Sequence, residues 1–156
     1  MTCQRNQLVI DSVDNPLSLR APAAERPRVL VMGGSNDIFY SGSDVGARAN
    51  MGAMLHQLMG AGIAPIVGIP IPFDPAHAPA RWADIANYTA ASPMLEAYCD
   101  WLERYCQAFG VDYVNFRTDF FTAEGRLREE LFADGLHPNG EGHQIMANRL
   151  CAEVLT

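Results

Sequence analysis

Three short strand-like runs, each followed by a helical pattern or a loop, constrain the fold of this chain more than any other feature. The run 28–33 is continuously apolar and ends in two glycines, the run 63–69 lies between a glycine and a proline, and the run 111–116 follows a glycine. A continuous apolar run of this length is typical of a strand buried on both faces. Strand–helix alternation with short links predicts an α/β fold with a small parallel sheet sandwiched between helices.

Stripes of apolar residues mark three helices. One lies within 44–60, one begins at Ser92 with Pro93 in its first turn, and the last begins near Asn139 or Gly140. The residues predicted to face the core are Met51, Met54, Leu55, Leu58 and Met59 in the first helix; Leu95, Tyr98, Cys99, Leu102, Tyr105, Cys106 and Phe109 in the second; and Ile145, Met146, Leu150, Val154 and Leu155 in the third.

The chain divides into an arm and a single domain. Residues 14–27 contain three prolines and little periodicity, so residues 1–27 are predicted to form an irregular arm, with a very short strand at 8–10. Residues 28–156 are predicted to form the α/β domain, which a chain of 156 residues with 49% apolar content can support. Residues 70–81 carry four prolines and predict an irregular segment within that domain.

The charge balance excludes two classes of partner. Lys and Arg number 11 against 18 Asp and Glu, which gives a net charge of −7. Nucleic acids and anionic membranes attract basic surfaces, so we expect neither as a partner. No apolar run approaches the roughly 18 residues of a membrane span. The first residues also lack the pattern of a signal peptide, and we expect a cytoplasmic protein.

The cysteines and histidines match no common metal or redox motif. The four cysteines form no C-x-x-C pair. Cys99 and Cys106 lie about 10.5 Å apart along a helix, beyond the roughly 7 Å that a disulfide allows, so we expect buried thiols. The four histidines form no H-x-x-x-H or H-E-x-x-H pattern. We therefore expect no metal site and no cofactor.

The first stretch with candidate chemistry is Gly33-Gly34-Ser35-Asn36-Asp37, where the first strand ends. In parallel sheets, ligands bind beyond the carboxyl ends of the strands. A glycine such as Gly34 lets a backbone N–H approach a ligand, and the amide of Asn36 can donate to a developing oxyanion. The alternative is a plain turn, since all these residue types are common in turns.

The second stretch is Asp134-Gly-Leu-His137-Pro138, directly before the last helix. Pro138 disfavours a helical backbone at His137, which places this histidine on a loop. Asp134 can accept a hydrogen bond from its Nδ1–H and leave Nε2 free as a general base. The alternative is a loop leading into the helix, in which Asp134 binds backbone donors and His137 is merely exposed.

Together the two stretches resemble the SGNH, or GDSL-type, hydrolase family. The family's G-x-N-D block is matched at residues 34–37, and its D-x-x-H-P block at residues 134–138. The resemblance covers the C-terminal two-thirds of a typical family member and implies a flavodoxin-like sheet. It also implies that Asn36 and Gly34 contribute to the oxyanion and substrate site, that His137 is the base, and that Asp134 orients it.

The family's first G-D-S block and its second block are not found. The nearest candidate nucleophile is Ser12, in Leu8-Val-Ile10-Asp11-Ser12, where Ile10 replaces the motif glycine. Only 23 residues separate Ser12 from Asn36. A single crossover between parallel strands takes about a dozen residues or more, so the helix, strand and helix that the family places there do not fit. The sequence therefore predicts an N-terminally incomplete member.

Two functions stay open at this point. The first is a GDSL-type esterase that hydrolyses a small acyl ester through an acyl-serine, truncated and inactive as given unless Ser12 supplies the nucleophile. In that case the segment 70–81 and Trp82 are candidates for a wall of the substrate site. The second is a degenerate, non-catalytic binding or assembly module, with strands supplied by another chain. The strand at 29–32 would then lie at an uncovered sheet edge, which favours a homo-oligomer.

Overall fold

The three strands form one parallel sheet. The structure, a computed structural model, describes residues 26–154. The strands are β1 (Arg28–Val31), β2 (Ala64–Ile69) and β3 (Asp112–Asn115), in the order β1-β2-β3. Arg28 pairs with Ala64, and Ile66 pairs with Asp112. The predicted α/β fold with a small parallel sheet is confirmed. The predicted arm, residues 1–27, lies almost entirely outside the described residues.

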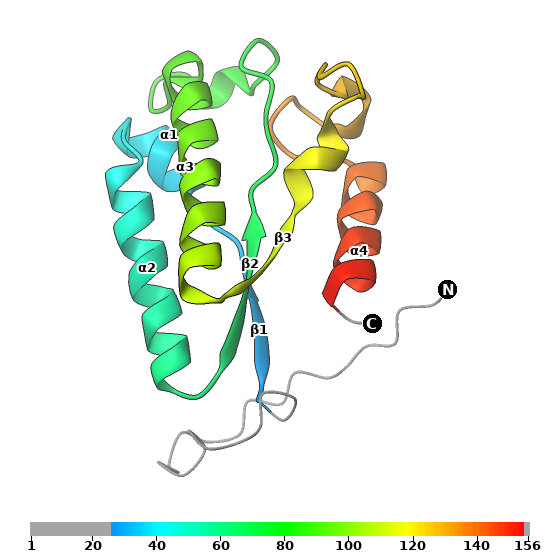
Figure 1. Cartoon of the computed structure of the whole chain (residues 1–156). Coiled ribbons are helices and arrows are strands. Elements are labelled where there is room, and N and C mark those ends of the chain that lie inside the picture. Colours follow the sequence, from blue (N-terminus) through cyan, green and yellow to red (C-terminus); the bar gives the residue numbers. More distant parts are fainter. Residues whose placement is uncertain (1–25, 155–156) are drawn as a thin grey trace.

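Helices cover both faces of this sheet (Figure 1). On one face lie α1 (Ser35–Ser41), α2 (Val45–Gly60) and α3 (Tyr88–Phe109), and on the other lies α4 (Gly140–Val154). Three short 3₁₀ helices lie in the connections: η3 (Ala80–Trp82), η4 (Phe116–Phe120) and η5 (Glu129–Leu131). The last helix begins where the sequence predicts it, at Gly140.

The middle strand, β2, distributes its side chains between the two layers. Val67 and Ile69 are fully buried and pack in the core formed with α1, α2 and α3. Ile66 packs with Val114 of β3 and with Met146 of α4 in the core of the opposite face. Successive side chains of a strand point to opposite faces, so this alternation fixes which helices lie on each side.

The prediction that the first strand is buried on both faces is wrong. Leu30 of β1 is 42% exposed, and Met32, directly beyond the strand, is 48% exposed. Among residues 26–154, β1 pairs only with β2 and forms one edge of the sheet. An apolar run does not reveal whether a strand is central or at an edge, because that depends on its neighbours in space.

The helix α3 begins at Tyr88 rather than at the predicted Ser92. The side chain of Asn87 caps it by accepting a hydrogen bond from the backbone N–H of Ala90 over 3.1 Å. Pro93 therefore lies inside the helix, on an exposed position. The sequence pattern was misleading because proline is most common in the first turn of a helix. In α3, a full turn of helix precedes Pro93.

Two predicted core positions are exposed. Met54 of α2 is 41% exposed, whereas Met51 and Leu55 of the same helix are fully buried. Phe109 ends α3 and is 56% exposed, with its ring 4.5 Å from that of Tyr105. The other stripe residues within the described part are buried or half-buried, and Leu155 lies outside it. As predicted, Cys99 and Cys106 are buried free thiols.

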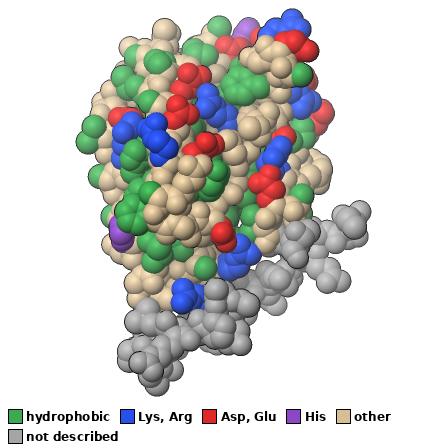
Figure 2. Space-filling view, in the orientation of Figure 1, with side chains coloured by type: hydrophobic (Ala, Val, Ile, Leu, Met, Phe, Trp, Pro, Cys, Tyr) green, Lys and Arg blue, Asp and Glu red, His purple; other side chains and the backbone are tan. Residues whose placement is uncertain are grey.

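Charged side chains of both signs are interspersed on the face shown in Figure 2. Ion pairs among the described residues include Arg117 with Glu96 at 3.2 Å and with Asp100 at 3.8 Å. Surface pairs of this kind add little stability each. No described helix combines the length and the apolar character needed to cross a membrane.

Candidate active site

The loop at 134–137 precedes α4 and is built around the carboxylate of Asp134. Nδ1 of His137 lies 3.0 Å from both of its oxygens. Its Oδ1 also accepts the backbone N–H groups of His137, over 2.8 Å, and of Leu136, over 3.2 Å. Gly135 adopts φ +74, a conformation that glycine tolerates without strain. Asp134 therefore does what both sequence interpretations describe: it satisfies backbone donors, and it holds the imidazole.

Asp134 favours its ionised form in this loop. Partial burial raises the pKa of its carboxyl, but the hydrogen bonds from the backbone and ring of His137 and from Leu136 outweigh it, so the pKa lies below the ordinary 3.8. An ionised carboxylate at Nδ1 favours the tautomer that carries its proton there. In that tautomer of the neutral ring, Nε2 is the acceptor nitrogen, and the side chain is 58% exposed. This is the arrangement that a general base requires.

Asn36 lies in the first turn of α1, just beyond the carboxyl end of β1. Its side chain is exposed and forms no hydrogen bond with any described residue. An unengaged amide N–H₂ at this position is available to an incoming ligand. The structure therefore places Asn36 at the carboxyl ends of the strands, where ligands of parallel folds bind.

Gly34 precedes α1 with φ +103. A Cβ at this position would lie only 2.5 Å from ring atoms of Tyr98, which is fully buried in α3. The Tyr98 hydroxyl donates a hydrogen bond to the carbonyl oxygen of Gly33 over 3.1 Å. The stretch before Asn36 is thus held against the core and is more than a freely exposed turn.

The loop at 134–137 lies at the same end of the sheet as Asn36. β1 and β2 are parallel, so their carboxyl ends lie at the same end of the sheet. Shortly after β2, the backbone N–H of Asp74 donates to the carbonyl oxygen of Gly135 over 2.8 Å. This bond ties the histidine loop to the segment that leaves β2. Asn36 and His137, from opposite ends of the described chain, are therefore brought to the same end of the sheet.

Residues 70–79 are irregular, as predicted, whereas the last two residues of the predicted segment 70–81 begin η3 beside the histidine loop. Nη2 of Arg81 lies 3.9 Å from Oδ2 of Asp134, and its guanidinium lies 5.7 Å from the ring centroid of Trp82. The Trp82 ring is in turn 6.5 Å from that of Tyr40 in α1. Arg81 was not recognised in the sequence, since only the fold brings its charge to Asp134.

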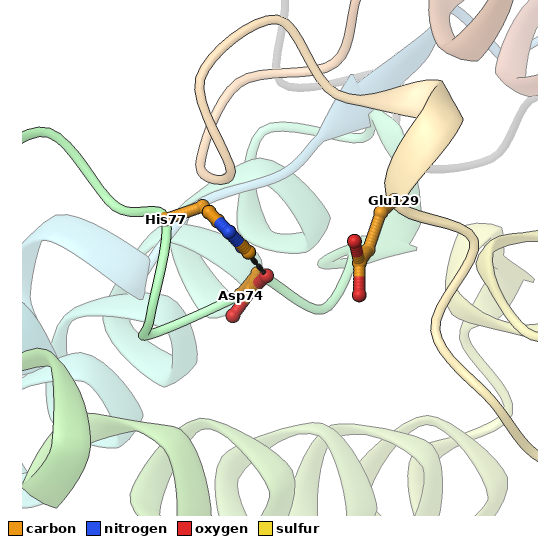
Figure 3. Close-up of side chains that lie close together, drawn as sticks. All are labelled: Asp74, His77 and Glu129. Carbon is orange, nitrogen blue, oxygen red and sulfur yellow. Dashed lines mark hydrogen bonds and ion pairs between the residues drawn. The ribbon is translucent and has the colours of Figure 1, made fainter.

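A second Asp-x-x-His pair, Asp74 and His77 (Figure 3), contacts the histidine loop through Gly135. The Asp74 carboxylate is hydrogen-bonded to Nδ1 of His77 and accepts the backbone N–H of Ala76 over 2.9 Å. The bond to Asp74 raises the pKa of His77, and the same bond lowers the pKa of Asp74. Glu129 of η5 faces this pair. These residues were not predicted as a site from the sequence, although the spacing of Asp74 and His77 repeats that of Asp134 and His137.

No serine within residues 26–154 is hydrogen-bonded to His137. The hydroxyl of Ser41 donates to the carbonyl oxygen of Ser43 over 2.9 Å, and the Ser43 hydroxyl accepts the N–H of Val45 over 3.3 Å. Ser12, the candidate nucleophile, lies outside the described residues. The described part therefore contains a candidate general base, its carboxylate partner and an amide donor, but no serine that is hydrogen-bonded to the base.

Comparison with protein families gives a match over most of the chain. The model described as the GDSL-like lipase/acylhydrolase family matches residues 7–145. This range contains Ser12 as well as the two stretches at 33–37 and 134–138. A comparison with curated proteins gives no match.

Solved structures with a similar fold include two bacterial proteins and one insect domain. A GDSL-like lipase from Bacteroides thetaiotaomicron is 22% identical, with a TM-score of 0.63 over 80% of this chain. A member of the lipolytic G-D-S-L family from Veillonella parvula is 20% identical, with a TM-score of 0.61 over 89% of the chain and 69% of that protein. The OSK domain of Drosophila Oskar is 13% identical, with a TM-score of 0.67 over 85% of the chain and 64% of that domain. The chain spans only 60% of the Bacteroides lipase.

Proposed function

Because the chain belongs to the GDSL-like lipase/acylhydrolase family, we propose that it hydrolyses a small acyl ester through an acyl-serine. The observation that carries this proposal is the Asp134–His137 pair, with Nδ1 of the histidine 3.0 Å from the carboxylate. Such a pair is useful in catalysis only where the other ring nitrogen is accessible, and the side chain of His137 is 58% exposed.

In the proposed reaction, a serine Oγ attacks the ester carbonyl carbon while Nε2 of His137 accepts the hydroxyl proton. Asp134 stabilises the imidazolium that forms. The carbonyl oxygen becomes an oxyanion, to which the amide of Asn36 donates a hydrogen bond. The bond to the leaving group breaks as His137 returns the proton to the departing alkoxide. A water molecule, deprotonated in the same way, then releases the acid from the acyl-serine.

We assign the nucleophile to Ser12. The family match includes this residue, because it begins at residue 7. Ser12 also follows the apolar triplet at 8–10, as a nucleophile at the carboxyl end of a strand would. Within residues 26–154, no serine is hydrogen-bonded to His137.

A fluorophosphonate probe and p-nitrophenyl acetate together test the proposal. We expect the probe to label Ser12, as identified by peptide mass, and Ser12→Ala to prevent labelling. His137→Ala removes the general base and should lower kcat for the ester by about 10²–10⁴. Asn36→Ala removes one oxyanion donor and should lower kcat by about 10²–10³.

Two exposed residues of α4 provide matched controls. His143→Ala and Asn148→Ala remove the same side-chain types at exposed positions outside the proposed site, and both variants should retain the activity of the parent chain. Absence of labelling, together with turnover that His137→Ala does not change, would refute the proposed hydrolysis.

A non-catalytic assembly module is the second candidate function. It is favoured by the edge strand β1, where Leu30 is 42% exposed and no described strand pairs with its outer edge. Open apolar edges invite pairing with a second chain. Sedimentation at micromolar concentration separates the two: a Leu30→Lys variant should dissociate an edge-paired dimer, whereas a monomer would argue against this candidate.

A further inference from the structure

Three side chains that can bind a metal ion meet beside the histidine loop, outside the groups used in the proposed hydrolysis. Asp74 and His77 come from the segment after β2, and Glu129 comes from η5. One potential ligand atom from each side chain lies within 4.8 Å of the other two. In Figure 3, Glu129 of η5 lies across from the hydrogen-bonded Asp74–His77 pair.

We propose that Asp74, His77 and Glu129 bind a divalent transition-metal ion, with Zn²⁺ as the best match. An imidazole nitrogen combined with carboxylate oxygens is a donor set that zinc accepts, at bond lengths of about 2.0–2.2 Å. Calcium and magnesium prefer oxygen ligands alone, so the imidazole favours a transition metal. Three protein ligands would leave the remaining positions on the ion to water.

The donor atoms need only a small movement to reach coordination distance. Two ligands of a tetrahedral zinc ion lie about 3.4 Å apart at these bond lengths. The side chain of Asp74 is only 13% exposed, and its other oxygen accepts the N–H of Ala76, so it provides a fixed ligand. The side chain of His77 is 68% exposed, and Glu129 is exposed as well. The Glu129 side chain is free to turn toward a shared ion, and His77 would exchange its hydrogen bond to Asp74 for a bond to the ion.

The local charge also favours a cation. The carboxylate of Glu129 forms no hydrogen bond or ion pair with a described residue. The neighbouring Arg128 does not neutralise it, because its guanidinium binds Glu130 at 2.9 Å and the carbonyl oxygen of Asp119 at 3.1 Å. Two carboxylates thus face one imidazole, and a divalent ion would balance their charge.

The backbone holds the pair in place against the histidine loop. The N–H of Asp74 donates to the carbonyl oxygen of Gly135, and a Cβ at Gly135 would lie 2.6 Å from the carbonyl carbon of His77. A bound ion would therefore join the segment after β2, which contacts the loop at 134–137, to η5. An ion that binds the folded chain but not the unfolded chain should raise the melting temperature.

The test measures Zn²⁺ binding by the full chain, prepared without a histidine tag and treated with a chelator, by isothermal titration calorimetry. We expect one ion per chain and a rise in melting temperature when zinc is added. His77→Ala and Glu129→Gln should each weaken binding by about tenfold or more, since each removes a direct ligand. Circular dichroism of the two variants checks that they remain folded.

Three further variants identify the site. His143→Ala and Glu124→Gln remove an exposed histidine and an exposed glutamate elsewhere, and both should bind zinc as the parent chain does. His137→Ala tests the neighbouring Asp-x-x-His pair and should also retain binding. The proposal is overturned if the parent chain binds no zinc, or if binding survives His77→Ala and Glu129→Gln but is lost in His137→Ala. Neither result bears on the ester hydrolysis, which fluorophosphonate labelling tests separately.

Discussion

Tyr98 holds Gly34 from within the core: its ring fills the space in which a side chain at position 34 would lie, 2.5 Å away. Its hydroxyl donates to the carbonyl oxygen of the preceding Gly33 over 3.1 Å. Burial raises the pKa of Tyr98 well above its usual range, so the hydroxyl remains a donor at any working pH. Through these contacts, α3 fixes the stretch that presents Asn36.

Gly34→Ala should therefore destabilise the fold strongly. The positive φ costs a non-glycine residue about 1–2 kcal/mol. The contact with Tyr98 adds overpacking of about 1–3 kcal/mol. Urea unfolding measures the change. Gly52→Ala is the matched control, because Gly52 lies inside α2 with no atom near its would-be Cβ, and alanine there should stabilise by about 0.5–1 kcal/mol. Equal stability of Gly34→Ala and the parent chain would contradict this account.

Tyr98→Phe should remove the hydrogen bond to Gly33 and keep the packing of the ring. We expect a loss of about 1–2 kcal/mol in the free energy of unfolding, because the carbonyl of Gly33 loses its donor. Tyr113→Phe provides the comparison, since the Tyr113 hydroxyl only accepts an exposed hydrogen bond from Gln107 and its loss should cost less than about 0.5 kcal/mol. Similar losses in both variants would show that the bond to Gly33 adds nothing particular.

The elements that the sequence predicts well are those whose pattern reflects their own burial. β2 has two covered faces, and its apolar run marks it clearly. β1 has an equally apolar run, yet its position at the edge depends on which strands pair with it, which a local pattern does not contain. The start of α3 was missed for a related reason, because Pro93 suggested a first turn while Asn87 supplies the cap.

The same distinction applies to the candidate site. Asp134 and His137 are three residues apart, so a local turn is enough to join them, and the sequence predicted their contact. Asp74 and His77 have the same spacing, but they match none of the paired-histidine motifs that indicate a metal site in a sequence. Glu129 and Arg81 reach their partners only through the tertiary fold, and no local spacing indicates them.

The two buried thiols should be unreactive in the folded chain. Burial raises the pKa of Cys99 to about 12 and that of Cys106 to about 11, so neither forms much thiolate near neutral pH. We expect iodoacetamide at about pH 8 to leave both cysteines unmodified in the native protein and to alkylate both after unfolding in guanidinium. Peptide mass spectrometry separates them from the other cysteines. Native alkylation at the rate of the unfolded chain would contradict their burial.

Asp134→Asn should destabilise the fold at neutral pH, and the difference should shrink in acid. The pKa of Asp134 in the folded chain lies below 3.8, so its ionised form contributes stability above that pH, and this contribution is lost as the pH falls through the folded pKa. Asparagine keeps one acceptor oxygen but not the charge, and we expect a cost of about 1 kcal/mol at pH 7. Urea unfolding between about pH 7 and pH 3 measures the difference, and Asp84→Asn, at an exposed aspartate, controls for the loss of one charge. A difference that grows toward low pH would mean that the carboxylate does not stabilise the loop in its ionised form.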